Sequence, residues 1–74
     1  MRMDMRKLVG RNVRRVRTER RLTQEKLADL SGFGQQYISD LERGLRNPTV
    51  VTLYELAQAL NTTPTDLIKP ERKR

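Results

Sequence analysis

The sequence of 74 residues contains no cysteine and no histidine. Their absence excludes disulfide bonds, zinc sites built on thiolates or imidazoles, and catalysis by Cys-His or Ser-His pairs. We therefore expect no catalytic residue, no metal and no other cofactor. Long apolar runs are also missing: no segment approaches the length of a membrane span, and the opening residues MRMDMRK lack the apolar core of a signal peptide. This length predicts one small domain, near the size at which a single core only just suffices.

Positive charge is concentrated at the two ends of the chain, whose total is +7. Residues 1–21 have a net charge of +7 and residues 69–74 of +3, whereas residues 22–68 have a net charge of −3. A cationic surface attracts polyphosphate, although a solvated basic helix without a partner would have the same composition. A membrane-bound basic helix is disfavoured, because the apolar face of residues 6–20 offers only valines.

The spacing of apolar residues predicts an all-α fold with five helices, at about residues 6–20, 24–31, 35–43, 50–60 and 64–68. We expect residues 1–5 to be a flexible N-terminus, residues 6–68 to be the folded domain and residues 69–74 to be a mobile basic tail. The residues expected to face the core are Val9, Val13, Val16, Leu27, Ala28, Leu30, Phe33, Ile38, Leu41, Val50, Leu53, Leu56, Ala57, Leu60 and Leu67.

Capping residues mark the ends of several of these helices. Thr23, Thr49 and Thr63 are each followed by a helical pattern, so we expect them to be N-caps. Gly32 and Asn61 follow helical segments and tolerate a left-handed backbone, so we expect them to end those helices.

The segment LTQEKLADLSGFGQQYISDLERG, residues 22–44, places two short helices around the turn at Gly32. The second helix has one apolar face and one polar face, and the polar face comprises Gln35, Gln36, Ser39, Asp40 and Arg43. Glutamine matches the major-groove edge of adenine, aspartate can accept from the amino group of cytosine, and serine can do either. Polar residues would also simply keep a short helix soluble, so this face alone leaves both interpretations open.

The wider spacing favours DNA reading. Gln24, Ala28, Gly32, Ile38 and Leu41 fall where the helix-turn-helix pattern has a polar first residue, a small residue at the crossing, a turn glycine and two core aliphatics. With the flanking segments LVGRNVRRVR and NPTVVTLYELAQALN, the chain resembles phage repressor and Cro-type helix-turn-helix domains, the XRE family, over about residues 8–68. The resemblance implies a five-helix lambda-repressor-like domain that binds double-stranded DNA in a bacterial or phage-encoded cytoplasmic setting.

The resemblance also implies roles for particular residues. Bases would be contacted chiefly by Gln35 and Gln36, with Ser39 and Asp40 as weaker candidates one turn further along; Asp40 either contacts a base, rejects wrong sequences or is simply solvated. Phosphates would be contacted by Gln24, Arg17, Tyr37, Arg43, Arg46 and Asn47. Tyr37 either donates its hydroxyl to a phosphate or packs against the preceding helix.

Arg17 and Glu42 match an interior ion pair of phage repressors, so the resemblance implies that they tie the first helix to the third. Three positions depart from the family pattern. Lys26 stands where an acidic residue would complete a capping box in the second helix. Arg21 stands where a glycine often ends the first helix, which predicts a strained or differently shaped turn. Gly34 replaces the usual Ser or Thr cap of the third helix, so a side-chain cap should be missing there.

Together these features predict a sequence-specific transcriptional regulator, a repressor that binds an inverted repeat as a homodimer with the third helix in the major groove. We expect no small-molecule ligand and no membrane partner. A dimer surface would come from the last two helices, where Val51, Tyr54 and Ile68 are candidates, although scattered surface apolar residues explain them equally well. The alternative is a protein-interaction module, such as an antitoxin or adaptor, with weak DNA binding.

Overall fold

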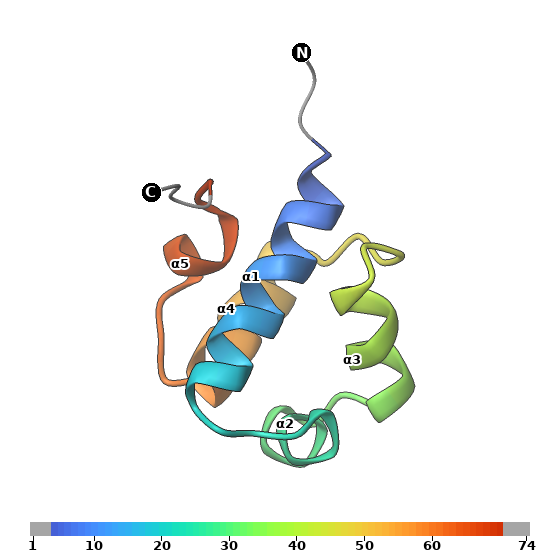
Figure 1. The fold of residues 1–74 in the computed structure, drawn as a ribbon, viewed down its shortest axis with the longest axis vertical. Coiled ribbons are helices and arrows are strands. Elements are labelled where there is room, and N and C mark those ends of the chain that lie inside the picture. Colours follow the sequence, from blue (N-terminus) through green and yellow to red (C-terminus); the bar gives the residue numbers. More distant parts are fainter. Residues whose placement is uncertain (1–3, 71–74) are drawn as a thin grey trace.

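The computed structural model describes residues 4–70, and within that range it contains five helices and no strand (Figure 1). The helices are α1 (Met5–Glu19), α2 (Gln24–Ser31), α3 (Gln35–Glu42), α4 (Val50–Ala59) and α5 (Pro64–Ile68). The all-α prediction with five helices is therefore confirmed. The expectations for residues 1–3 and 71–74 lie outside the described residues.

α1 begins one residue earlier than expected because Asp4 caps it. Asp4 Oδ1 accepts hydrogen bonds from the backbone N–H groups of Arg6 and Lys7, at 3.1 and 3.4 Å. Asp4 and Met5 therefore belong to the start of the helix. The prediction that they are part of a flexible N-terminus is wrong. An acidic cap also suits the positive end of the helix dipole.

The other capping predictions are confirmed. The side chains of Thr23, Thr49 and Thr63 accept hydrogen bonds from backbone N–H groups in the first turns of α2, α4 and α5. Gly32, with φ 83°, and Asn61, with φ 57°, adopt the left-handed backbone after α2 and α4. The short turns that follow can therefore redirect the chain without a long loop.

Arg21 takes the left-handed backbone that a glycine often adopts in this family, with φ 60°. The bonds around it close the end of α1: the N–H of Arg21 donates to the carbonyl of Thr18, and the N–H of Leu22 donates to that of Arg17, both at 3.0 Å. The turn therefore keeps its shape and holds a strain of about 1–2 kcal/mol at a non-glycine residue.

α1 is the central helix, with α3 on one side and α5 on the other, and α2 packs against both α3 and α4 (Figure 1). The buried core comprises Leu8, Val9, Val13, Val16, Leu27, Ala28, Ile38, Leu41, Leu56, Ala57, Leu60 and Leu67. Leu53, Phe33 and Tyr37 pack against its edge. No helix in residues 4–70 is long and apolar enough to cross a membrane.

Two residues expected in the core are instead exposed, Leu30 at 51% and Val50 at 80%, and the dimer candidate Ile68 is 42% exposed. At about 100° per residue, Leu30 lies roughly 110° from the midpoint of Leu27 and Ala28, and Val50 lies roughly a quarter turn from the stripe of α4. Ile68 is the last residue of α5, next to the buried Leu67. The prediction of core residues was therefore wrong for apolar residues at the edge of the buried stripe of a helix.

Polar side chains of α1 and of its C-cap residue, Arg20, bind the ends of the last two helices, and the sequence did not predict these contacts. Asn12 is fully buried, and its Nδ2 donates to the carbonyls of Leu67 and Lys69 at 3.1 and 2.9 Å. Arg20 donates from Nε to the carbonyl of Leu60 at 2.9 Å. Because the last carbonyls of a helix have no partner within it, these bonds fix α4 and α5 against α1.

The closest approach of α1 to α3 is at Gly10. A Cβ atom there would lie 2.5 Å from the carbonyl oxygen of Leu41 and 2.7 Å from that of Glu42. Real Cβ atoms do not come so close to backbone oxygen, so only glycine allows this spacing. The small residue at a helix crossing was predicted at Ala28, and the need for glycine at position 10 was not predicted.

We expect Gly10→Ala to lower the free energy of unfolding by about 1–3 kcal/mol, because the methyl group forces α1 away from α3 although alanine is the better helix former. Urea denaturation followed by circular dichroism measures the change. Gly34→Ala is the control for an added methyl group without a clash, since a Cβ there meets nothing within 4 Å; it should cost less, because it loses only the preference for glycine at the N-cap of α3. Equal stability of the two variants would contradict the steric argument.

Candidate nucleic-acid interface

α3 is anchored by one face and exposed on the other. Ile38 and Leu41 are fully buried and fix its rotation and depth. Gln35 and Gln36 are exposed on its first turn, while Ser39 and Asp40 are half-buried one turn later. The structure thus brings all four candidate base-contacting residues to one side of a rigid helix. As predicted, no side chain caps this helix at Gly34.

Three polar side chains on this outer face are bonded to one another. Oδ1 of Asp40 accepts from Nε2 of Gln36 at 3.0 Å and from a terminal guanidinium nitrogen of Arg43 at 2.7 Å. The hydrogen bond from Arg43, reinforced by that from Gln36, holds the pKa of the Asp40 carboxyl below its ordinary value. Asp40, which is charged at neutral pH like any ordinary aspartate, therefore stays a charged acceptor in more acidic solution too.

The predicted ion pair between Arg17 of α1 and Glu42 of α3 is present. Nε of Arg17 lies 2.6 Å from Oε2 of Glu42, and a terminal nitrogen lies 3.1 Å from Oε1. The two side chains are only 12% and 4% exposed. The remaining guanidinium nitrogen donates to the carbonyl of Leu22 at 2.8 Å, so Arg17 also holds the turn before α2.

Gln24, at the start of α2, adds a third donor to the same carboxylate. Its Nε2 donates to Oε1 of Glu42 at 3.1 Å, and the side chain is half-buried. Arg17 and Gln24, both expected at phosphates, are therefore engaged with Glu42 in this structure. A phosphate contact from Arg17 would require it to give up one of its present bonds, whereas Gln24 keeps one amide hydrogen.

Aromatic residues connect the turn of the motif to the loop after α3. The rings of Phe33 and Tyr37 are stacked with centroids 5.3 Å apart, and the guanidinium of Arg46 lies 4.8 Å from the centroid of Tyr37. Tyr37 packs on Phe33 of the turn and against the edge of the core, and neither of the two roles predicted for it is tested by these contacts. Arg46 is held beside α3 by the cation–π contact.

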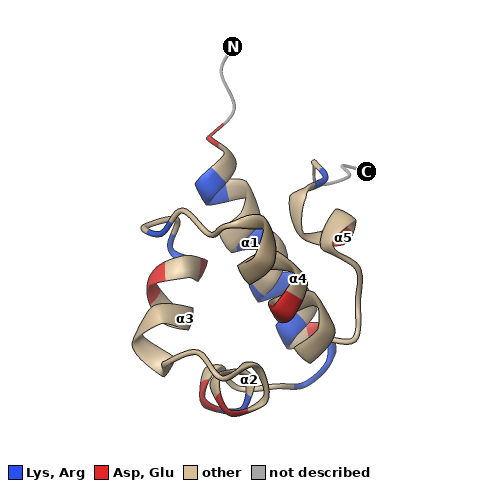
Figure 2. Cartoon of the chain, turned by 180° about the vertical axis from the view of Figure 1, so that it is seen from behind, with Lys and Arg blue, Asp and Glu red and all other residues tan. Residues whose placement is uncertain are grey.

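α1 carries more basic residues than any other helix, whereas most acidic ones are spread over α2, α3, α4 and α5 (Figure 2). The loop after α3 adds Arg46 and Asn47, both exposed. Arg43 and Arg46 therefore place positive charge at the C-terminal end of α3. Among residues 4–70, no group of three or more acidic side chains is placed to hold a metal ion.

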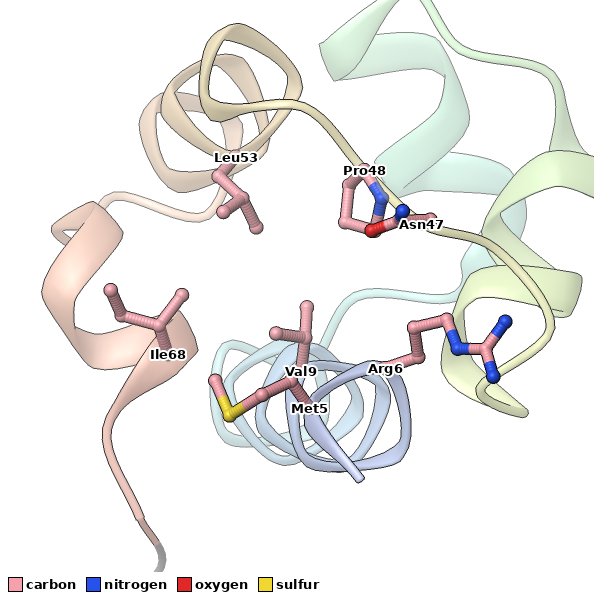
Figure 3. Close-up of a pocket in the computed structure, with 7 residues that line it drawn as sticks. All are labelled: Met5, Arg6, Val9, Asn47, Pro48, Leu53 and Ile68. Carbon is pink, nitrogen blue, oxygen red and sulfur yellow. The ribbon is translucent and has the colours of Figure 1, made fainter. Parts of the chain in front are cut away.

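A shallow apolar groove of about 160 Å³ lies between α1, α4 and α5, beside the loop after α3 (Figure 3). Val9, Leu53 and Ile68 point into this space, and Met5, Arg6, Asn47 and Pro48 complete its lining. The dimer candidates Val51 and Tyr54 on α4 are 64% and 52% exposed. Of the residues that line the groove, only Ile68 was predicted as part of a dimer surface, because groove walls form from residues distant along the chain.

Comparison with known proteins gives consistent matches. The profile of the family HTH_3, described as helix-turn-helix, matches residues 13–67. The uncharacterized HTH-type transcriptional regulator y4dJ of Sinorhizobium fredii is 63% identical over 68 residues, which are 92% of this chain and 88% of that protein. Control protein C.SmaI of Serratia marcescens is 44% identical over 66 residues, covering 89% of this chain and 79% of the relative.

Among solved structures, the restriction-modification controller protein C.AhdI from Aeromonas hydrophila superposes with a TM-score of 0.80 at 42% identity. The match covers 86% of this chain and 96% of the controller. These proteins are regulators and control proteins rather than enzymes.

We expect Glu42→Ala to lower the free energy of unfolding by about 3–5 kcal/mol, because it strands the buried guanidinium of Arg17 and removes the acceptor of Gln24. Thermal and urea denaturation measure the loss. Glu25→Ala, at an exposed acidic residue of α2, removes the same charge and should change stability by less than about 0.5 kcal/mol. An unchanged melting temperature for Glu42→Ala would contradict a structural role for the pair.

Proposed function

The chain belongs to the HTH_3 family of helix-turn-helix proteins, and we propose that it is a sequence-specific DNA-binding transcriptional repressor that inserts α3 into the major groove. The observation that carries the proposal is the outer face of α3, where Gln35 and Gln36 are exposed on a helix fixed from behind by Ile38 and Leu41. Rigid support matters because bidentate base contacts require defined geometry. The proposed setting is the cytoplasm of a bacterium.

In this proposal, Gln35 and Gln36 read bases, and each bidentate contact contributes about 1–3 kcal/mol of discrimination. Arg43, Arg46 and Asn47 hold phosphates on one side of the groove, and the N-terminus of α2 with Gln24 holds phosphate on the other. Arg46 is suited to this role, since its contact with Tyr37 orders a side chain that would otherwise lose freedom on binding.

We further propose that two copies bind an inverted repeat, with their α3 helices about 34 Å apart in successive major grooves. The surface around Val51 and Tyr54 of α4 and Ile68 of α5 offers apolar area for the dimer contact. The relatives named as control proteins favour a controller of a restriction-modification operon among the kinds of repressor. An antitoxin or adaptor that binds mainly protein is the alternative, to which the apolar groove beside α4 and α5 would contribute.

Selection of bound sequences from random DNA at moderate salt tests the proposal. The purified protein should enrich a short palindrome, whose two halves give the spacing of the two copies. Enrichment reports base-specific contacts, because phosphate contacts do not distinguish sequences. Binding that depends on salt alone, with no enriched sequence, would refute specific readout and favour the interaction module.

Single variants distinguish the residues proposed to contact bases from those proposed to contact phosphates. Gln35→Ala and Gln36→Ala should relax the preference at particular base pairs, whereas Arg46→Ala should weaken binding to all sequences alike. Arg46→Ala should also flatten the dependence of log K on log salt by about one unit. Selection and salt titration of the same variants measure both effects. The reverse outcome would mean that α3 is not the reading helix.

A further inference from the structure

Asp40 lies between two side chains that are proposed to meet DNA. A single oxygen, Oδ1, accepts from Nε2 of Gln36 one turn before it and from Arg43 nearly one turn after it. The side chain of Asp40 is 22% exposed, against 60% for Arg43. The carboxylate therefore lies closer to the helix surface than the arginine that covers it.

We infer that Asp40 is a positioning residue, which selects the amide orientation of Gln36 and so sets its base preference without touching a base. The inference rests on the proposed DNA-reading role of α3. A glutamine amide can present its oxygen or its nitrogen in either direction, and the two orientations recognise different base edges. An ionised carboxylate only accepts hydrogen bonds, so it selects the orientation in which the nitrogen faces Asp40.

The chosen orientation leaves the edge of the amide that adenine needs. Nε2 donates one hydrogen to Asp40. In the proposed geometry this is the hydrogen trans to Oε1, so the second hydrogen stays free beside Oε1. A donor and an acceptor side by side form the pair that bonds to N7 and N6 of adenine. Without the carboxylate, the amide rotates and offers either edge, at the added cost of ordering the side chain on binding.

Arg43 makes this arrangement compatible with DNA. A bare carboxylate facing the groove would be repelled by the phosphates, and a protonated one could donate and no longer select the amide nitrogen. The ion pair at 2.7 Å offsets the charge. An aspartate is already ionised at neutral pH, and the lowered pKa of Asp40 keeps it ionised in more acidic solution as well. Residues 36, 40 and 43 thus act as one unit, whereas Gln35 stands outside it.

A double-mutant comparison tests the inference. Random-DNA selection is performed with the wild-type protein, Gln36→Ala, Asp40→Ala and the double variant. We expect Asp40→Ala to relax the preference by about fivefold or more at the same base pair as Gln36→Ala. The double variant should resemble Gln36→Ala, because Asp40 acts only through Gln36. Relaxation at a different base pair, with additive losses in the double variant, would show direct reading by Asp40 and overturn the inference.

Asp29→Ala is the matched control, because Asp29 is an exposed aspartate of α2 outside the proposed contacts. It removes the same charge and should leave base preference unchanged. If it relaxes the same base pair as Asp40→Ala, the effect is one of charge and the inference fails.

The positioning of Gln36 by Asp40 can also be tested in the DNA-free protein, independently of the proposed function. In wild-type protein, the two Nε2 hydrogens of Gln36 should give NMR signals displaced from those of Gln35. In Asp40→Ala these signals should move to the positions of Gln35, with an unchanged melting temperature. Unmoved signals would overturn the positioning role, whereas a wild-type protein that enriches no sequence would overturn the DNA-reading function alone.

Discussion

The carboxylate of Glu42 is the point on which the position of α3 depends. It receives donors from Arg17 of α1 and Gln24 of α2, and it belongs to α3 itself. Three helices are therefore fixed at one buried group. A buried carboxylate without these donors would have a large desolvation penalty, so the correct arrangement of the helices is the one that satisfies it. Arg17 extends the same constraint to the turn before α2 through the carbonyl of Leu22.

Two backbone features make that arrangement sterically possible. Gly10 lets α1 lie against the carbonyls of Leu41 and Glu42, which brings Arg17 within reach of its partner two turns along α1. The left-handed backbone at Arg21 then turns the chain, so that Gln24 at the start of α2 reaches the carboxylate of Glu42. The strain at Arg21 is offset by the bonds that its turn enables. Packing of Ile38 and Leu41 supplies the remaining constraint, so that α3 cannot rotate about its axis.

Much of the fold could be predicted from the sequence, because the sequence features that begin, continue and end a helix are local. The threonine caps, the left-handed stops and the periodic apolar residues depend on neighbours within one turn, and they predicted all five helices. The pair between Arg17 and Glu42 was inferred through the resemblance, since a pair separated by 25 positions has no local signal. Gly10, Asn12 and Arg20 were missed for the same reason: each acts on a helix far along the chain. Leu30 and Val50 were expected in the core although they lie at the edge of the apolar stripe of their helix. A periodic pattern does not show how far around the helix the neighbouring helices cover it.

The surface chemistry of α3 shows how a segment of negative net charge can approach DNA. Residues 22–68 have a net charge of −3, and two of their carboxylates, Asp40 and Glu42, belong to α3. Each is bonded to an arginine, so neither presents a bare charge. In the proposed complex, the attraction to phosphate comes from α1 and from the loop after α3, at the edges of the proposed reading face. Salt screens long-range attraction far more than short hydrogen bonds between fixed groups. On this proposal, salt changes how tightly the domain holds any DNA, while its preferred sequence is set by the neutral amides of Gln35 and Gln36, of which Asp40 holds the second in place.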